Sequence, residues 1–431
     1  MGYVSVMCDA LVALGEHTAN GATIFAKNSD RKPGECQPFV QHPAAAHAPG
    51  CRVRCTHLEI PQVAETYRVM GHSPWWVWGF EHGVNEHAVA CGNLTVFSNE
   101  PIEETPGLIG MDLVRLGLER GRTARETLEI IAGLIETHGQ GGPALAPDGT
   151  GYHNAFQIAD PEEAWVLETS NRRWAARRVR MGACSNHMSL GRDWEIASTD
   201  LESFARGEGW WERNGRIDVA GAYRNPHVPP HISEGRQRNA TQRLAESDGA
   251  LDVARMQAIL RDHGDRGAAW EPGTDPAEEA HFTVCAHSEP VHRTAASLVA
   301  ELPAERERPW PVWIGFDTPC SSIFLPVYVD GLIPAELAAG GPQPGGESAW
   351  WIFHALGERV ARDGLTRTPL VRRAFEPLES KLEADRMDAE ARAMAAPNQD
   401  ERARILSEFM ARALAETLER TRELIDRLAE P

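Results

Sequence analysis

The stretch VMCDALVALGEHTANGATIFAKNSDR, residues 6–31, contains two runs of apolar and β-branched residues on either side of a polar segment. Such runs are typical of β-strands, and the Asn-Gly pair between them is a frequent hairpin turn. The sequence therefore predicts that the second run returns antiparallel to the first. This hairpin would place Lys27 and Asp30 near Cys8.

The charge and length of the chain limit its class. Its 431 residues suffice for two or three domains, or for one large domain with an appendage. The formal charge of −19 disfavours a nucleic-acid partner, because the phosphate backbone is also negative. No apolar run reaches the roughly 18 residues of a membrane span, and the chain begins without a signal-peptide pattern. We therefore expect a soluble, cytoplasmic protein without membrane partners, and leave open whether it forms a homo-oligomer.

Hydrophobic periodicity predicts a mixed architecture. Strand patterns run from about residue 3 to 99 and from 152 to 186, whereas 110–139 has the spacing of two helices that would cover one face of a sheet. Residues 200–250 suggest loops and short helices, and the chain after 345 suggests helices. The individual strand runs include ATIFAKN (22–28), YRVMGH (67–72), WWVWGF (75–80), EHAVACGN (86–93), HFTVCAH (281–287), PVWIGF (311–316) and SIFLPVYV (322–329).

This order of elements favours an α+β fold with two sheets packed face to face and helices outside, a four-layer αββα sandwich. We expect one domain over residues 8–345 and a helical C-terminal region over 346–431 packed on it. A single packing stripe in that region passes through Leu414, Leu418, Thr421, Ile425 and Leu428.

Cys8 has two interpretations. Cysteine is often a buried core residue, and Lys27 and Asp30 would then belong to an exposed turn. Alternatively, Cys8 is a nucleophile. If the bond after Met7 is cut, the new α-amine, with an ordinary pKa of roughly 7.7–8.0, becomes a base on the same residue as the thiol. Either residues 1–7 are removed autocatalytically, or translation starts at Met7 and that methionine is trimmed.

Several segments, in the same order, resemble the secernin and dipeptidase branch of the N-terminal nucleophile hydrolases, which are related to penicillin acylases and bile-salt hydrolases. These segments are CDALVAL with FAKNSDR, EHGVNEHAVACGN (81–93), EEAWVLETSNRRWAA (162–176), CSNHMSLGRDWE (184–195), VCAHSEPVHRTAASLVAELP (284–303), TPCSSIFLPV (318–327) and ESAWW (347–351). The resemblance implies the αββα fold and a cysteine that cleaves amide bonds.

The resemblance also implies roles for particular residues. Cys8 matches the nucleophile and Asp30 the carboxylate that contacts its α-amine, while Lys27 stands where the acylase relatives usually have arginine. Asn93 matches an asparagine of the oxyanion hole, whose side-chain amide would stabilise the developing negative charge.

Two further positions complete the expected site. Asn186 matches a second asparagine near the nucleophile, and we expect it to share in stabilising the oxyanion. Arg236 or Arg238 matches an active-site arginine, with Arg236 preferred. His187 is expected to be structural or to support the residues that contact the substrate, because an N-terminal cysteine needs no histidine base.

Other patterns have simpler explanations. Cys51, Cys55 and His57, and likewise Cys285 with His287, suggest zinc ligands, but their spacing is irregular and buried thiols are favoured. For the tryptophans of SPWWVWGF (73–80) core packing is the default, with a place in the substrate pocket as the alternative. RRWAARRVR (172–180) suggests a solvated strand face, with carboxylate binding as the alternative.

The sequence thus predicts a cysteine hydrolase of amide bonds in small substrates, such as dipeptides or N-acyl amines, that acts through a thioester. No metal or organic cofactor is required. Two alternatives remain within this prediction, a dipeptidase and an acyl-amide hydrolase. A third is a catalytically silent, secernin-like scaffold that binds partners.

Overall fold

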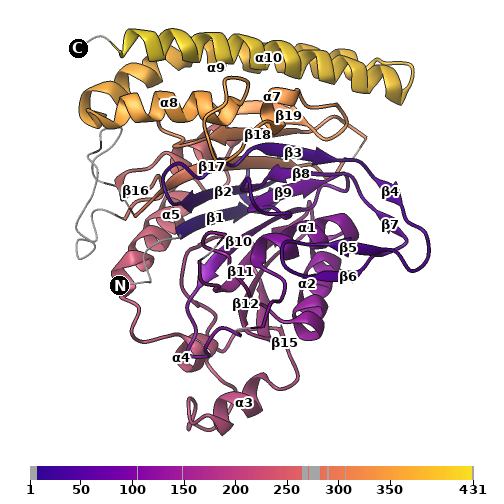
Figure 1. Ribbon diagram of the computed structural model, residues 1–431, viewed down its shortest axis with the longest axis vertical. Coiled ribbons are helices and arrows are strands. Elements are labelled where there is room, and N and C mark those ends of the chain that lie inside the picture. The colour runs from indigo at the N-terminus through magenta and orange to yellow at the C-terminus, as the bar shows by residue number, and fades with distance from the viewer. Residues whose placement is uncertain are drawn as a thin grey trace.

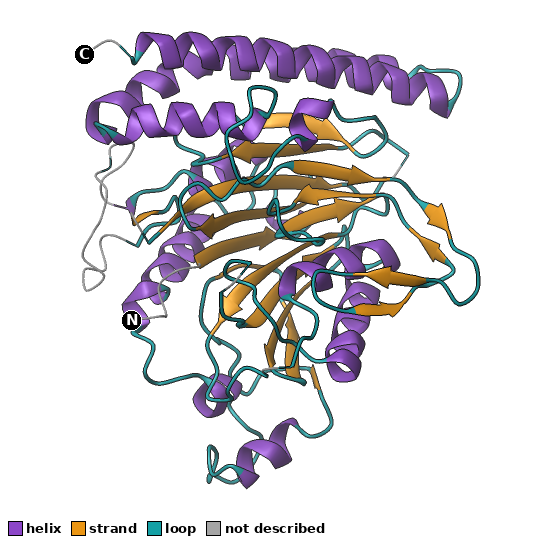
Figure 2. Cartoon of the chain, viewed as in Figure 1, coloured by secondary structure: helices purple, strands orange, loops and turns teal. Residues whose placement is uncertain are grey.

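Two antiparallel β-sheets lie face to face at the centre of the molecule, with helices on their outer faces (Figures 1 and 2). The computed structural model describes residues 7–103, 105–147, 149–264, 270, 282–288, 291–305 and 307–429. The expected four-layer αββα arrangement is confirmed.

The first sheet carries the N-terminal hairpin. Its strands, in spatial order through the described chain, are β14 (Met181–Cys184), β1 (Met7–Ala13), β2 (Thr23–Arg31), β17 (His292–Leu302), β18 (Pro311–Phe316) and β19 (Leu325–Tyr328), and β16 (His287–Ser288) pairs with β17. β1 and β2 are antiparallel, as their sequence predicted. The central strand β17 was not among the predicted strands.

The second sheet is a meander with one additional strand at each edge. In spatial order it comprises β15 (Ile196–Ala197), β13 (Arg173–Arg178), β12 (Ala164–Ser170), β11 (His153–Ala159), β10 (Ala90–Val96), β9 (His82–Asn85), β8 (Val69–His72) and β3 (Phe39–His42). Two small ribbons flank it, β4 (Ala45–Ala46) with β7 (Glu65–Thr66), and β5 (Arg52–Arg54) with β6 (Glu59–Pro61).

Helices cover both sheets. α1 (Gly110–Arg120) and α2 (Ala124–His138) pack on the second sheet, where two helices were predicted, and α5 (Glu234–Glu246) and α6 (Val253–Leu260) pack on the first. α8 (Ala349–Ala361), α9 (Gly364–Met394) and α10 (Gln399–Arg427) lie at the end of the molecule next to β18 and β19 (Figure 1). The short helices are η1 (Gly15–His17), α3 (Leu201–Gly207), α4 (Val219–Tyr223), η2 (Pro230–Ile232) and α7 (Ala335–Ala338).

Strand β1 is buried on both faces, and this position explains its almost continuous apolar sequence. Cys8 and Ala10 pack with Val96 of the second sheet, whereas Leu11 and Ala13 pack against α5 and α6. The nucleophile candidate therefore lies between the two sheets.

The C-terminal helices have the expected packing stripe. Leu414, Leu418, Thr421 and Leu428 are buried, and Ile425 packs against the same cluster. None of the helices in the described ranges has the length and apolar character needed to cross a membrane.

The predicted strand at WWVWGF (75–80) is wrong. Residues 73–81 form turns, in which the Val77 N–H bonds the Pro74 carbonyl and the Phe80 N–H bonds the Met111 carbonyl of α1. A Cβ at Gly79 would lie 2.1 Å from that same carbonyl oxygen, so the chain approaches α1 more closely than any other residue type permits.

Two other strand predictions were too long. In EHAVACGN (86–93) the strand begins only at Ala90, because residues 86–89 form the turn from β9, in which Ala88 has a φ of 57°. In HFTVCAH, residues 282–286 are not strand and β16 begins at His287; His281 lies outside the described residues.

The basic run at 172–180 does not form one solvated strand face: Ala175 and Ala176 are buried, and the arginines on either side of them are exposed or half-buried. Its guanidinium groups pair with surface carboxylates: Arg172 with Glu103, Arg173 with Glu100, Arg177 with Asp193, Arg178 with Glu195 and Arg180 with Glu16. Because these guanidinium groups already pair with carboxylates of the protein, the described residues do not indicate that the run binds the carboxylate of a substrate.

Candidate active site

The β1–β2 hairpin brings three predicted site residues together. In its register Met7 lies opposite Asp30, and Ala10 lies opposite Lys27. Because cross-strand partners point to the same face, Cys8 and Lys27 share the face toward the second sheet, while Asp30 shares the other face with Met7. All of these side chains are buried.

Asn186 holds the backbone of Cys8. Because β14 pairs with β1, the loop after β14 returns Asn186 to the start of β1. Its Oδ1 accepts a hydrogen bond from the Cys8 backbone N–H at 2.7 Å and another from Arg236 Nη2 at 2.7 Å. Its Nδ2 donates to the Thr95 carbonyl of β10 at 2.9 Å, so the amide also links the two sheets.

Arg236, on α5, is the arginine that reaches this site. It is buried; its Nη1 forms an ion pair with the Asp9 carboxylate and donates to the Cys8 carbonyl oxygen at 3.3 Å. Arg238, the alternative from the sequence, is exposed. Asp9 was not predicted, although it directly follows the nucleophile candidate.

Asp30 offers a buried acceptor beside Met7. Its Oδ1 accepts from the Thr294 hydroxyl at 2.7 Å, and its Oδ2 lies 4.0 Å from Arg236 Nη1. That Oδ2 has no hydrogen-bond partner among the described residues. Burial raises the pKa of Asp30 to about 8, and the Arg236 charge opposes this rise. The carboxylate would therefore gain from an additional cation.

Lys27 is part of a buried chain of charges. Its Nζ lies 3.6 Å from Glu81 Oε2, and Glu81 Oε1 lies 3.2 Å from Arg31 Nη1. Arg31 also pairs with Glu35 at 2.6 Å and approaches the Tyr152 hydroxyl at 3.4 Å. Within this chain of charges, only Lys27 was predicted from the sequence to be a site residue. Glu81 begins one of the segments that resemble secernins, and this position was the available signal.

Asn93 lies between Asn154 and Glu81. Its Nδ2 donates to Asn154 Oδ1 at 3.1 Å and approaches Met111 Sδ at 3.6 Å. With the amide rotated by 180°, the nitrogen donates instead to Glu81 Oε2 at 3.3 Å and to the Glu81 carbonyl at 3.0 Å. In both orientations the two amide hydrogens have protein acceptors. A contact with a substrate oxygen therefore requires Asn93 to exchange one of these bonds.

The Cys8 thiol is not ionised in this state of the chain. Burial raises its pKa to about 12; Lys27 opposes this rise, whereas Glu81 and Asp30 add to it. The Cys8 nitrogen is a peptide N–H here, because Met7 precedes it. The thiol therefore has a nearby cation but no amine base until the bond between Met7 and Cys8 is cut.

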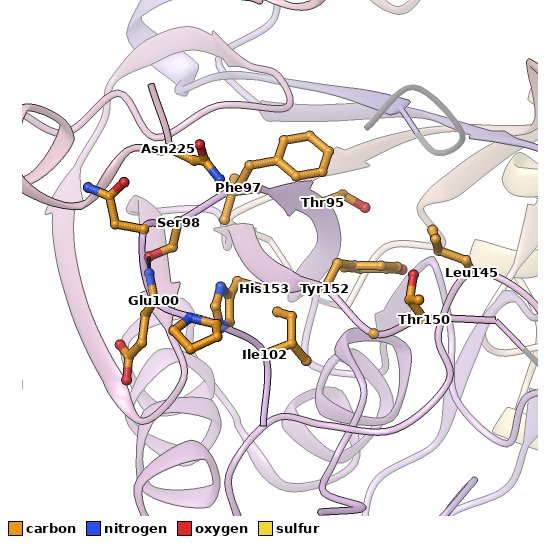
Figure 3. Close-up of a pocket in the computed structure, with 14 residues that line it drawn as sticks. Thr95, Phe97, Ser98, Glu100, Ile102, Leu145, Thr150, Tyr152, His153 and Asn225 are labelled. Atoms are coloured by element: carbon orange, nitrogen blue, oxygen red, sulfur yellow. Dashed lines mark hydrogen bonds between the residues drawn. The ribbon is translucent and has the colours of Figure 1, made fainter. Parts of the chain in front are cut away.

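A cavity of about 260 Å³ lies at the end of β10 (Figure 3). Thr95, Val96 and Phe97 at the end of β10 form part of its wall, and Tyr152 forms another part. Thr95 also accepts a hydrogen bond from Asn186, the residue that bonds the Cys8 nitrogen, and this contact relates the cavity to the nucleophile candidate. The three tryptophans of residues 73–80 are not among the residues that line it.

Met7 occupies an apolar site of its own next to this cavity. It is buried against Val228, Ile232 and Phe282, with Phe97 packed beside them. Phe97 also lines the cavity. Phe97 is therefore shared by the Met7 site and the cavity wall.

His187 fits its expected structural role. Its Nδ1 lies 2.9 Å from the Ser233 hydroxyl. Burial lowers the pKa of His187 to about 4, so that the ring is neutral near pH 7. Among the described residues, no hydrogen bond joins the His187 ring to Cys8.

The family of the chain agrees with this geometry. The pattern of peptidase family C69 matches residues 7–223, just over half of the chain, and begins next to Cys8. The protein belongs to peptidase family C69 and is a cysteine-type hydrolase of amide bonds. The predicted place in the secernin and dipeptidase branch of the N-terminal nucleophile hydrolases is confirmed.

The chain is also similar to three solved structures. A mutant of conjugated bile acid hydrolase from Clostridium perfringens is 13% identical with a TM-score of 0.41, over 71% of this chain and 88% of that chain. Penicillin V acylase from Agrobacterium tumefaciens is 15% identical with a TM-score of 0.41, over 72% and 83%. The N-acylethanolamine-hydrolyzing acid amidase ortholog of Caenorhabditis elegans is 11% identical with a TM-score of 0.33, over 69% and 94%. These values are too low for a substrate to be carried over.

Proposed function

We propose that the mature protein hydrolyses linear amide bonds in small substrates, such as dipeptides or N-acyl amines, with Cys8 as its N-terminal nucleophile. The hydrogen bond of 2.7 Å from the Cys8 nitrogen to Asn186 Oδ1 carries this proposal. Once the bond to Met7 is cut, that nitrogen is an α-amine beside its own thiol, and its acceptor is already in place.

The α-amine serves as the base. Asn186 Oδ1 already accepts from this nitrogen, and we assign the unpartnered Asp30 Oδ2, which lies across the hairpin from Met7, as a second acceptor. The Arg236 guanidinium, which already bonds Asn186, disfavours a second positive charge close by and so favours the neutral amine. Lys27 favours the thiolate that remains when the amine takes the thiol proton.

The reaction then follows acyl transfer to sulfur. The thiolate attacks the amide carbon, and the carbonyl oxygen becomes an oxyanion. The α-ammonium returns its proton to the leaving nitrogen as the carbon–nitrogen bond breaks, and a thioester with Cys8 remains. Water, deprotonated by the same amine, hydrolyses the thioester and restores the thiol.

We assign the oxyanion contact to Asn93, which would exchange a bond to Asn154 or Glu81 for the substrate oxygen. One such donor typically accounts for about 10²- to 10³-fold in rate. Asn186 is better placed to hold the amine than the oxyanion, because its Oδ1 faces the Cys8 nitrogen and its Nδ2 is bonded to Thr95.

The size and lining of the cavity support a small substrate. Its volume of about 260 Å³ lies below the roughly 300–1,000 Å³ of drug-sized pockets. Phe97 and Tyr152 offer apolar surface, and the apolar site of Met7 adjoins Phe97. We therefore place an apolar side chain or short acyl group on the acyl side of the scissile bond.

The decisive experiment combines intact mass with thiol labelling. We expect the purified active protein to begin at Cys8 and iodoacetamide to label Cys8 faster than any other thiol. Cys8→Ala should lose this labelling and the activity, while Cys55→Ala, which removes another buried thiol, should retain both.

The result also separates the alternatives. A chain that retains Met7 and labels Cys8 no faster than Cys55 would support the non-catalytic scaffold. If Cys8 is processed and reactive, a panel of dipeptides and N-acyl amines distinguishes a dipeptidase from an acyl-amide hydrolase.

A further inference from the structure

A second cluster of reactive side chains lies apart from the Cys8 site. Its members are His263, which follows α6, Cys285, which precedes β16, His287 at the start of β16, and Cys320, which follows β18. All four are buried. The proposed hydrolysis uses none of them.

Their ligand atoms converge on one point. His287 Nε2 lies 3.3 Å from His263 Nε2, 3.3 Å from Cys285 Sγ and 3.3 Å from Cys320 Sγ. One ligand atom from each of the four residues lies within 4.8 Å of all the others.

Hydrogen bonds alone do not account for these contacts. An imidazole nitrogen carries either one hydrogen or one lone pair, so it forms one good hydrogen bond at a time. His287 Nε2 has three polar neighbours at the same short distance. A single metal ion that binds all four atoms would satisfy them together.

The three distances from His287 fit the edges of a tetrahedral ion site. With Zn–N bonds of about 2.05 Å and Zn–S bonds of about 2.3 Å, the edges of a ligand tetrahedron are about 3.3 Å for N–N, about 3.6 Å for N–S and about 3.8 Å for S–S. The observed N–N distance of 3.3 Å equals that edge, and both N–S distances of 3.3 Å are close to theirs.

We propose that His263, Cys285, His287 and Cys320 bind one Zn²⁺ ion as a structural site. Two thiolates with two imidazoles are a donor set that zinc prefers in closed, four-coordinate sites. The site is closed because four protein ligands complete the tetrahedron, and the Trp270 indole stacks on the His287 ring at 3.5 Å between centroids. A structural ion rather than a catalytic one is therefore inferred.

The ion would join elements that are distant in the sequence. It ties the end of α6 and the start of β16 to the segment after β18. The Ala286 N–H, between two of the ligands, bonds the Thr294 hydroxyl at 2.9 Å, and that hydroxyl donates to Asp30 at 2.7 Å. The zinc site would thus help to fix the position of a carboxylate at the Cys8 site.

The test measures the zinc content of the full-length protein by elemental mass spectrometry. We expect about one zinc ion per wild-type chain, and a decrease of roughly tenfold or more in Cys320→Ser. Cys55→Ser, which changes another buried thiol, should keep the zinc. Cys8→Ala should also keep the zinc, because Cys8 is not one of the four proposed ligands. This variant is needed because an N-terminal cysteine could itself bind a metal ion.

A second measurement covers the case in which Cys320→Ser does not fold. Wild-type protein reconstituted with Co²⁺ should show the absorption of a tetrahedral site with thiolate ligands, and excess chelator should lower its thermal midpoint. Two results would overturn the proposal: wild-type protein from zinc-supplemented medium that contains no zinc and takes up no Co²⁺, or a disulfide between Cys285 and Cys320 in freshly purified protein. Zinc that is lost in Cys8→Ala but kept in Cys320→Ser would also overturn it.

Discussion

Replacing Lys27 by methionine tests the electrostatics of the Cys8 site most directly. The Lys27 side chain passes over Gly92, where a Cβ would lie 2.4 Å from Lys27 Cδ. Methionine has a stem of similar shape and retains this packing, so the substitution mainly removes the charge. The ammonium that is lost lies 3.6 Å from Glu81 Oε2.

The size of the effect follows from that distance. Two unit charges at 3.6 Å attract each other by about 4–5 kcal/mol at an effective dielectric constant of about 20. Glu81 keeps Arg31 at 3.2 Å, but its other oxygen loses its charged partner in a buried site. We expect Lys27→Met to lower the free energy of unfolding by about 3–5 kcal/mol, the usual cost of breaking a buried pair.

The same substitution should slow the chemistry of Cys8. Lys27 is the strongest influence that lowers the pKa of this thiol. A nearby opposite charge typically shifts a pKa by about 1–3 units, so labelling of Cys8 by iodoacetamide should slow by roughly 10- to 1,000-fold. Urea unfolding and peptide mapping of the labelled thiol measure the two effects separately.

The matched control is Lys27→Met combined with Glu81→Gln. Removing both charges should recover much of the stability, because no unpaired carboxylate remains, while labelling of Cys8 stays slower than in the wild type. A single variant Lys27→Met that unfolds within about 1 kcal/mol of the wild type and labels at the same rate would refute this account of the site.

Three further predictions concern stability and are measured by urea unfolding. Burial raises the pKa of Asp30 from 3.8 to about 8, so between these pH values the folded chain retains a proton that the unfolded chain releases. The free energy of unfolding should therefore fall as the pH rises through this range, by at most about 1.4 kcal/mol per pH unit. Asp30→Asn should remove this pH dependence. Gly357→Ala would place a Cβ 2.1 Å from Arg293 Nη2, which belongs to a buried ion pair, and should lower the free energy of unfolding by about 3–5 kcal/mol. Its control is Gly346→Ala, where a Cβ has nothing within 4 Å and the free energy of unfolding should change by no more than about 0.5 kcal/mol. Asp252→Ala removes the cap of α6 and should cost about 0.5–2 kcal/mol; an unchanged midpoint would contradict this role.

Local patterns in the sequence determined most of the elements around the site. The Asn-Gly turn and the two flanking runs predicted the β1–β2 hairpin, and helical spacing predicted α1, α2 and the C-terminal helices. The hairpin alone accounts for the proximity of Cys8, Lys27 and Asp30. These features depend on residues that are close in the sequence, where periodicity and turn chemistry act directly.

Strand β17 shows where such patterns fail. HRTAASLVAEL (292–302) is buried almost throughout because it lies in the middle of its sheet, with helices on one face and the second sheet on the other. Burial on both faces removes the alternation that identifies a half-exposed strand, and its alanines suit a helix equally well.

The remaining parts of both sites were decided by tertiary structure. Asn186 and Arg236 were predicted as site residues only from the family resemblance. The position of α5 on the sheet then showed that Arg236, and not the exposed Arg238, reaches the site. Glu81 reaches Lys27 only because the two sheets pack face to face.

The cluster of four metal-ligand candidates makes the same point. The sequence showed Cys285 and His287 as neighbours in the chain, whereas His263 and Cys320 join them only in the folded protein. Local sequence encodes the period and the turns of each element. The convergence of distant side chains depends on sheet register and packing, which no short stretch of residues contains.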